Sequence, residues 1–330
     1  MPMRILQRAG VLLFGVVTMY LILKALGLSG RVDRNMDHVN QDTVYFVAVE
    51  EVYGILYVPV DEYLIRCMAD YWEKLVTADG RYAAVIPTLQ DETLEALAVV
   101  IRTQLVCVMD QTGRDRFSGR KFFFADARRI QENWGYEGDI TSEQILAELV
   151  SSPEGDLWKR MRKAIESTHG KVLLYNQDPA DVTYHMMSNG QTRENANVFP
   201  WANTADCPDD KEQELSVTRV FYPLEELERL GIPAGSEGKP EVIQDAWGYV
   251  DRVIWGDMVF SGEGLAERLK LPSSAYLIMP DEEGCTLIAY GLGHGYGMSI
   301  MQADRMAQNE ADTNQLLSFF YALLDCKKIE

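Results

Sequence analysis

The chain is short of cysteine, histidine and basic residues, and each shortage argues against a class of site. Its 330 residues include five cysteines and four histidines. The cysteines are odd in number and widely spaced, so they match neither a zinc ribbon nor a redox pair. Fifty acidic residues against 31 basic ones give a formal charge of -19, whereas binding to a phosphate backbone requires clustered Lys and Arg. We therefore expect no nucleic-acid partner, no metal and no cofactor.

The sequence also lacks internal repeats and low-complexity tracts. Apolar residues make up 47% of it, which is enough to bury a core in one large or two ordinary domains. The composition therefore predicts a globular protein.

One long hydrophobic run stands near the N-terminus. It spans Ala9 to Leu28, reads AGVLLFGVVTMYLILKALGL and contains one charge, Lys24. About 20 apolar residues suit a membrane-spanning helix, and a lysine near its end can reach the interface. Arg4 and Arg8 before the run favour a cytoplasmic N-terminus. The run predicts an uncleaved anchor at residues 1–29, with cleavage near LGLSG as the alternative.

After the anchor, we expect a polar linker at residues 30–43 and a folded body at residues 44–330. Val44 to Val60 is rich in β-branched and aromatic residues and predicts strands. The other expected features are a helical insertion at 71–84, a polar and mostly helical insertion near 110–160, an acidic loop-rich stretch at 204–245, and a helix and strand at the C-terminus.

Residues 291–299, GLGHGYGMS, place four glycines around His294. Glycine adopts positive φ and permits close approach, but this many glycines would weaken a regular strand or helix. The pattern indicates a site that displays His294. The alternative is a tight turn around a structural histidine.

A helix is expected to begin near Glu92. Thr88 and Asp91, three residues apart, resemble a capping box, which would place Glu92 in the first turn. These residues alone favour a Glu92 that simply complements the helix dipole. Arg102 lies almost three turns further on and is interpreted as structural, pairing across the core.

Four segments, in this order, resemble the stage II sporulation protein D family, whose described members are membrane-anchored peptidoglycan lytic transglycosylases of spore-forming bacteria. No single segment is diagnostic, but their order and spacing make the resemblance specific. The segments are ETLEALAVVIRT at 92–103, AIESTHGKVLLYNQDPADVTYHMMSNG at 164–190, FSGEGLAERLKL at 260–271 and GLGHGYGMS at 291–299.

The resemblance implies that Glu92 is the catalytic acid/base, cutting the MurNAc–GlcNAc β-1,4 bond of denuded glycan strands to leave 1,6-anhydroMurNAc ends during engulfment. One carboxylate can serve both proton transfers, because the muramic acid closes an internal ring. The substrate-binding residues implied are His185, Ser188, Asn189, Gly190, His294, Gly295 and Ser299.

The fold we expect is α+β, a mixed β-sheet with packed helices, following one transmembrane helix. The resemblance places the body outside the cytoplasm, on a single-pass anchor in the cell membrane. It implies the stage II sporulation protein P amidase and a membrane protein as partners. Some family members hold zinc after the histidine loop, but this chain has Ser188 and Gln191 there; His185 and Cys207 alone would make a weak site.

Two departures from the family pattern leave another class of function open. Glu95-Ala96-Leu97 replaces Lys-Ala-Gln beside the catalytic position, and Ile300-Met301-Gln302 replaces the residues that usually follow GMS. Such changes could weaken glycan positioning while sparing the fold. The alternative is a non-catalytic peptidoglycan-binding or amidase-activating module.

Overall fold

The computed structural model describes residues 43–51, 54–78, 85–114, 121–136, 154–233 and 239–329. Tyr45–Thr112 and Phe123–Ile329 form one compact unit. Residues 1–44, 113–122 and 330 form the other, of which only a few strand residues are described. The predicted anchor and almost all of the predicted linker lie outside the described residues.

The first sheet has the strand order β2-β1-β4-β3. β1 (Thr43–Glu51) and β2 (Gly54–Pro59) are antiparallel, with Val47 opposite Val58. The predicted strands at 44–60 are therefore confirmed. Both strands follow from β-branched and aromatic residues that fit a pleated surface.

The mostly helical interpretation of residues 110–160 is partly wrong. β3 (Asp110–Arg114) and β4 (Lys121–Asp126) are strands, followed by the helices α5 (Ala127–Trp134) and α7 (Glu154–Ser167). Phe123 of β4 stacks on Tyr45 of β1, with ring centroids 5.1 Å apart. Pairing of aromatic side chains between strands stabilises a sheet. The aromatic run in β4 is short, so the average polarity of residues 110–160 does not reveal this strand.

The helix predicted at 71–84 is part of a longer one. α3 runs from Val60 to Ala78, so its second half continues a helix that begins eleven residues earlier, and residues 79–84 are outside the described part. Its buried side chains recur at helical spacing, because one face packs on the core. They include Tyr63, Leu64, Cys67, Met68, Trp72 and Leu75.

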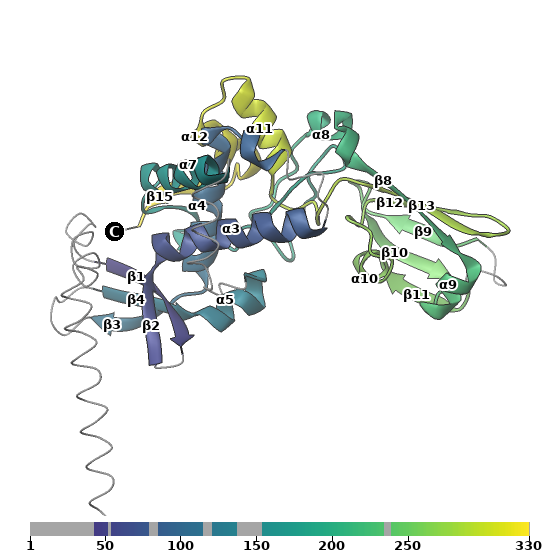
Figure 1. Ribbon diagram of the computed structural model, residues 1–330, viewed down its shortest axis with the longest axis horizontal. Coiled ribbons are helices and arrows are strands. Elements are labelled where there is room, and N and C mark those ends of the chain that lie inside the picture. Colours follow the sequence, from purple (N-terminus) through teal and green to yellow (C-terminus); the bar gives the residue numbers. More distant parts are fainter. Residues whose placement is uncertain are drawn as a thin grey trace, which may run out of the picture. The chain divides into compact units, whose positions relative to one another are not determined.

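α4 (Asp91–Cys107) is the central helix, preceded by the short 3-10 helix η3 (Ile86–Thr88). Figure 1 shows α3, α7 and α12 around it, and α4 contacts all three. Every residue from Ala96 to Val106 is buried. A helix that is buried on all sides can present a side chain to a ligand only near its ends, and Glu92 lies at its N-terminal end.

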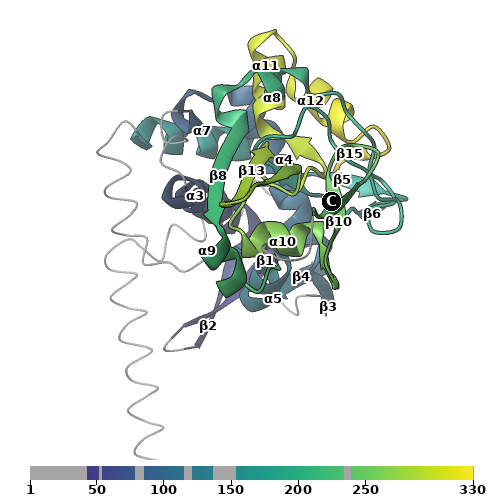
Figure 2. The ribbon, with the colours of Figure 1, turned by 90° about the vertical axis from the view of Figure 1, so that its right-hand side faces the viewer.

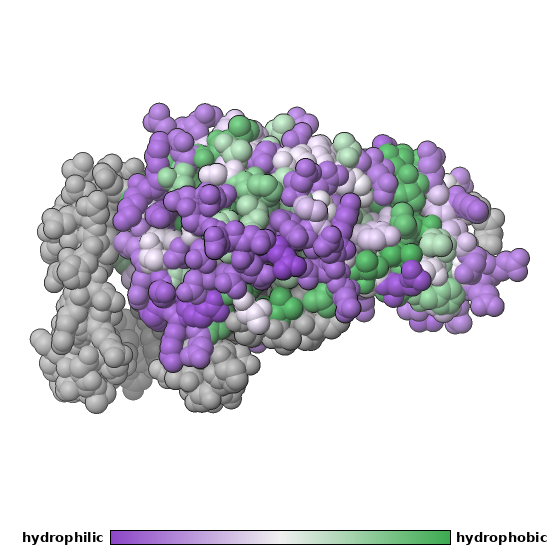
Figure 3. Space-filling model, turned by 90° about the horizontal axis from the view of Figure 1, so that it is seen from above, coloured by the Kyte–Doolittle hydropathy of each residue, from purple (hydrophilic) through white to green (hydrophobic). Residues whose placement is uncertain are grey.

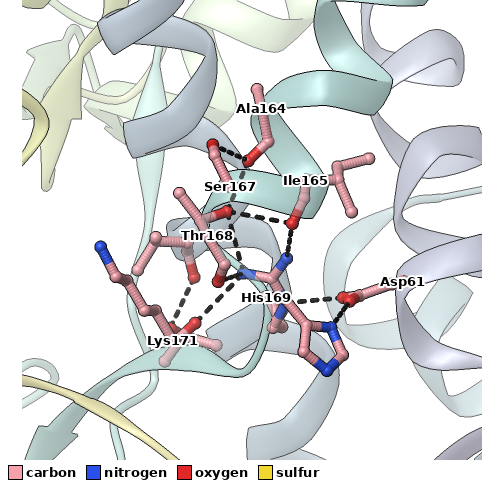
Figure 4. A network of polar contacts seen from close by, with 10 residues as sticks. Asp61, Ala164, Ile165, Ser167, Thr168, His169 and Lys171 are labelled. Carbon is pink, nitrogen blue, oxygen red and sulfur yellow. Dashed lines mark hydrogen bonds and ion pairs between the residues drawn. The ribbon is translucent and has the colours of Figure 1, made fainter. Parts of the chain in front are cut away.

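Arg102 lies fully buried in this core. Its guanidinium donates to Asp61 Oδ1 at 2.7 Å and to the carbonyls of Ile165, Thr168 and Lys171 at 2.9–3.2 Å. Asp61 also contacts His169 Nδ1 (Figure 4). The prediction that Arg102 pairs across the core is therefore confirmed.

Around α4, β5 (Lys171–Tyr175) lies between β15 (Asp325–Lys328) and β6 (Asp178–Pro179). α12 (Thr313–Phe320) precedes β15, which confirms the helix and strand predicted at the C-terminus.

A second hydrophobic core, separate from the one around α4, is formed by residues of two three-stranded sheets and of two short helices, α9 and α10. One sheet has the order β11-β10-β9 and the other β12-β13-β8. The bounds are β8 (Val217–Pro223), α9 (Leu224–Arg229), β9 (Glu241–Gln244), β10 (Val250–Trp255), β11 (Met258–Ser261), α10 (Gly262–Arg268), β12 (Tyr276–Pro280) and β13 (Gly284–Tyr290).

The prediction that residues 204–245 are loop-rich is partly wrong, because β8, α9 and β9 lie within them. β8 pairs with β13 along its whole length (Figure 2), so it is a structural strand. One face of β8 remains open, with Val217 41% and Phe221 47% exposed. Figure 3 shows hydrophobic surface gathered in this part of the molecule.

The described residues therefore form an α+β fold, as predicted in class. The single mixed sheet that was expected is wrong, because the strands of the described ranges pair in several small sheets. Within them, no helix is long and apolar enough to cross a membrane.

Candidate functional site

The histidine loop (residues 184–190) and the glycine turn (residues 291–299) lie side by side. β7 (Tyr184–His185) and β14 (Met298–Ser299) pair in parallel, with Ser299 opposite His185. This pairing brings His185 and His294 together, with ring centroids 5.7 Å apart. Two segments more than 100 residues apart in the sequence thus contribute to one cluster.

The glycines of the turn approach the protein's own chain. Gly291, Gly293, Gly295 and Gly297 all have positive φ, between 70° and 113°. A Cβ at Gly297 would lie 1.9 Å from the carbonyl oxygen of Thr183, and Cβ atoms at the other three would also meet atoms of the protein closer than 3 Å. The glycines are therefore explained by packing of the turn on the histidine loop and its surroundings.

Gly297→Ala should separate the two segments. The substitution combines an unfavourable φ with a clash against backbone, and we expect a loss of at least about 3 kcal/mol in the free energy of unfolding. Gly135→Ala is the matched control, because Gly135 has φ +68° but open space around its Cβ position, so only about 1 kcal/mol should be lost. Urea unfolding measures both, and equal losses would contradict the close packing.

Both histidines of the cluster are held neutral. Burial, with His294 nearby, lowers the pKa of His185 to about 3, and burial together with Arg193 lowers the pKa of His294 to about 4. His185 Nδ1 donates to the carbonyl of Tyr296 at 3.1 Å, which leaves its buried Nε2 as an acceptor without a partner among the described residues. His294 Nδ1 accepts from the Tyr296 amide at 3.1 Å, and His294 is half-buried.

Asp210, on the short helix α8 (Pro208–Glu212), joins the two segments. Its Oδ2 accepts from the Ser188 amide at 2.8 Å, the Ser188 hydroxyl at 2.6 Å and the Ser299 hydroxyl at 2.8 Å. All three side chains are buried. Asp210 was not predicted from the sequence. It lies among several acidic residues of the stretch 204–245, and no local pattern there shows which carboxylate becomes buried.

Burial raises the pKa of Asp210 to about 6, above its ordinary value near 4 in an unfolded chain. The folded protein therefore binds this proton more tightly than the unfolded chain. The resulting stability is fully present below pH 4 and is lost as the pH rises through 6.

Asp210→Asn should remove this pH dependence. At each pH, the free energy of unfolding of the variant is subtracted from that of the unsubstituted protein. We expect this difference to fall by about 3 kcal/mol as the pH rises from 4 to 7. Urea unfolding of both proteins across this range tests the sign, and a constant difference would contradict it.

The remaining predicted binding residues lie around this cluster. Asn189 Nδ2 donates to the carbonyl of Trp247 at 2.8 Å, and the Gly190 amide donates to Ser188 Oγ at 3.0 Å. Gly295 lies against Tyr249, whose ring a Cβ there would meet at 2.3 Å. Of the predicted binding residues, Asn189, Gly190 and His294 are partly exposed.

Glu92 lies in the first turn of α4, as predicted, but that helix is capped differently. Thr88 Oγ1 donates to the carbonyl of Val85, so the predicted capping box is wrong. Instead, Asp304 Oδ1 accepts from the Gln90 amide at 2.6 Å and from Thr93 Oγ1 at 3.2 Å. A carboxylate from another helix therefore satisfies the start of α4, and a local motif cannot reveal it.

The carboxylates beside Glu92 are both engaged. Asp91 pairs with Arg160 at 2.7 Å and Lys163 at 3.4 Å, and the Arg160 hydrogen bond helps to lower the pKa of Asp91. Glu95 accepts from the hydroxyls of Ser167 and Thr313 at 2.7 and 2.5 Å. By contrast, no hydrogen bond or ion pair within the described part of the chain occupies the half-buried Glu92 side chain.

Helix α11 (Ile300–Gln308) connects the two halves of the candidate site. Ser299 caps its N-terminus by accepting from the Gln302 amide at 3.3 Å, and Asp304 of the same helix holds the start of α4. Five residues of helix correspond to about 7.5 Å of rise. The histidine cluster and the Glu92 end of α4 are therefore attached to one short helix.

The described residues contain no cluster of three or more potential metal ligands. The thiol of Cys207 donates to the carbonyl of Ala205 at 3.4 Å.

Residues 51–175 match the family model SpoIID, described as stage II sporulation protein. The chain is 25% identical over 287 residues to stage II sporulation protein D of Bacillus subtilis (strain 168), covering 84% of this chain and 76% of that protein. It is also 25% identical over 282 residues to the protein of the same name from Bacillus amyloliquefaciens, covering 83% and 75%.

The resemblance inferred from the four motifs is thereby confirmed. The family match contains Glu92 and ends before the histidine loop and the glycine turn. The similarity to the two Bacillus proteins extends over most of the chain.

Proposed function

From the resemblance of this chain to stage II sporulation protein D, we propose that it acts on the cell wall during sporulation as a membrane-anchored lytic transglycosylase. Its substrate would be denuded peptidoglycan strands, cut at the MurNAc–GlcNAc β-1,4 bond. The observation that carries the proposal is Glu92, half-buried in the first turn of α4. Among the described residues, its carboxylate has no hydrogen bond or ion pair, while both neighbouring carboxylates are engaged.

In the proposed reaction, Glu92 works twice. It first donates a proton to the glycosidic oxygen as the bond between that oxygen and C1 of MurNAc breaks. It then takes the proton of the MurNAc 6-hydroxyl as that oxygen bonds to C1. Glu92 is thereby returned to its acid form, and no water is consumed. A second catalytic carboxylate is not required.

The other predicted residues would orient the sugar. His294 and Asn189 are partly exposed and carry hydrogen-bonding groups suited to hydroxyls and acetamido groups. Neutral imidazoles would bind these uncharged groups without a large desolvation penalty. His185, Ser188 and Ser299 are buried and would act by shaping the loops.

The proposed setting is the outer side of the cell membrane, with residues 9–28 as the single-pass anchor. The partners would be the stage II sporulation protein P amidase, which removes stem peptides, and a membrane protein of the engulfment complex. The charge of -19 repels anionic wall polymers at long range, so binding would depend on local hydrogen bonds.

A non-catalytic glycan-binding or amidase-activating module is the second candidate. It is favoured by Glu95, which replaces the usual cation near Glu92 and is held by Thr313 and Ser167. Incubation of the full chain with stem-peptide-free peptidoglycan, followed by mass spectrometry, separates the two. New 1,6-anhydroMurNAc ends support the enzyme, whereas binding without such ends supports the module.

Asp304→Ala should reduce activity by loosening the start of α4. Loss of the acceptor for Gln90 and Thr93 resembles loss of a helix cap and should cost about 1–2 kcal/mol in the free energy of unfolding. Because Glu92 lies between these residues, we expect about 10-fold slower release of anhydro ends. Asp126→Ala is the control, since Asp126 caps α5 by accepting from the Arg128 amide. If both variants lose activity equally, Asp304 has no special role.

A further inference from the structure

We propose that Asp210 is a positioning residue that locks the histidine loop to the glycine turn, by accepting hydrogen bonds from Ser188 and Ser299 on one carboxylate oxygen. Its effect on catalysis rests on the proposed function, whereas its effect on the two segments does not.

The geometry fixes both serine side chains. Each hydroxyl has one hydrogen, and both hydrogens are directed to Asp210 Oδ2 at 2.6 and 2.8 Å. Ser188 Oγ also accepts from the Gly190 amide, and Ser299 Oγ accepts from the Gln302 amide. The hydroxyls are therefore committed within the protein and hold its own segments together.

Asp210 is itself held from two sides. The Asp209 amide donates to Gln302 Oε1 at 3.2 Å, and Gln302 Nε2 donates to Asp209 Oδ2 at 2.9 Å. On the other side, the Cys207 amide donates to the Gly190 carbonyl at 2.9 Å. A helix of five residues has few bonds of its own, so these contacts fix α8 between α11 and the histidine loop.

The role requires an acceptor oxygen rather than a charge. The titratable groups that interact electrostatically with Asp210 include Asp209, Cys207 and Tyr249, and Asp209 disfavours ionisation of Asp210. No ion pair within the described ranges joins Asp210 to a cation, although Arg305 lies 3.7 Å from Asp209. The second oxygen of Asp210 is buried without a hydrogen-bond partner there. An amide of the same shape offers the same acceptor.

The hydrogen bonds from Ser188 and Ser299 to Asp210, which we call the lock, set the position of the two histidines relative to each other. His185 lies three residues before Ser188, and His294 lies five residues before Ser299. When both serines bind one oxygen, the two ring positions are fixed by short chain segments. Without that oxygen, the segments are joined by the two-residue pairing of β7 and β14, by the backbone hydrogen bonds between Met187 and Leu292, and by the bond from His185 to the Tyr296 carbonyl. None of these holds the two serine side chains, and small displacements at a site can cost about 100-fold in rate.

Hydrogen exchange of the full chain, read by mass spectrometry, tests the lock without requiring activity. In Asp210→Ala, we expect exchange in peptides covering 184–190 and 298–302 to rise about 10-fold or more, while peptides of α4 stay protected. In Asp210→Asn, exchange in those peptides at pH 4, where the Asp210 carboxyl of the unsubstituted protein is protonated, should stay within about three-fold of the unsubstituted protein. Asp206→Ala is the control, because Asp206 is an exposed carboxylate of the same segment.

The release of 1,6-anhydroMurNAc ends should follow the same order, with Asp210→Asn restoring most of what Asp210→Ala loses. Unchanged exchange in Asp210→Ala, or equal loss in both variants, would overturn the proposal. If Asp210→Ala does not fold, Ser299→Ala removes one of the two hydroxyls and should loosen the same peptides. If the unsubstituted protein releases no anhydro ends, the exchange result still decides the lock, and only the proposed function fails.

Discussion

Glu92→Gln should abolish the release of 1,6-anhydroMurNAc ends while leaving the fold unchanged. Glutamine keeps the shape of the side chain but cannot donate and recover the proton, and loss of a general acid costs at least about 100-fold in rate. Since no hydrogen bond or ion pair in the described part of the chain holds this carboxylate, the free energy of unfolding should change by less than about 0.5 kcal/mol. Mass spectrometry of digested glycan and urea unfolding measure the two effects.

Glu95→Gln is the matched control. It removes the same charge one turn away on α4. One of the hydroxyls of Ser167 and Thr313 can still donate to the amide oxygen, and the other can accept from the amide NH2 group. We expect it to keep most of the activity. If Glu92→Gln remains active, or if both variants lose activity equally, Glu92 is not the acid/base and the module becomes the better description.

Arg102→Met should strongly lower the free energy of unfolding, because Arg102 is fully buried in the core around α4. Methionine fills much of the volume but leaves Asp61 and the carbonyls of Ile165, Thr168 and Lys171 without their donor. Removal of one partner of a buried charged pair typically costs about 3–5 kcal/mol. Asp61 is partly exposed and retains its contact with His169, so we expect a loss near the lower end.

Arg128→Met gives the comparison for an exposed pair. Arg128 pairs with Asp126 and Glu50, and all three side chains are largely exposed, so the loss of stability should be much smaller than for Arg102→Met. Urea unfolding at one pH compares the two variants. A loss of the same size at both sites would show that the buried network around Arg102 does not hold α4 in place.

The sequence predicted several elements because their signals are local. The β-branched and aromatic residues of 44–60 give strands, and Glu92 opens a helix whose Ala96–Val106 stretch is buried. The resemblance to stage II sporulation protein D was also readable, because four ordered motifs retain recognisable residues. The strands β3, β4 and β8 were missed, since their segments are polar or acidic on average. β4 and β8 are also stabilised by pairing with strands distant in the sequence, β1 and β13.

The sequence alone predicted which residues would carry chemistry, Glu92 and the two histidines, and it contains the glycines that let their turn pack closely. Tertiary structure alone decided how these residues are held. The cap of α4 comes from Asp304, 214 residues after Gln90, and the oxygen that joins Ser188 to Ser299 comes from Asp210. Residue type and spacing along a chain record local conformation, whereas burial and long-range hydrogen bonds exist only after the chain has folded, so no local pattern could identify either carboxylate.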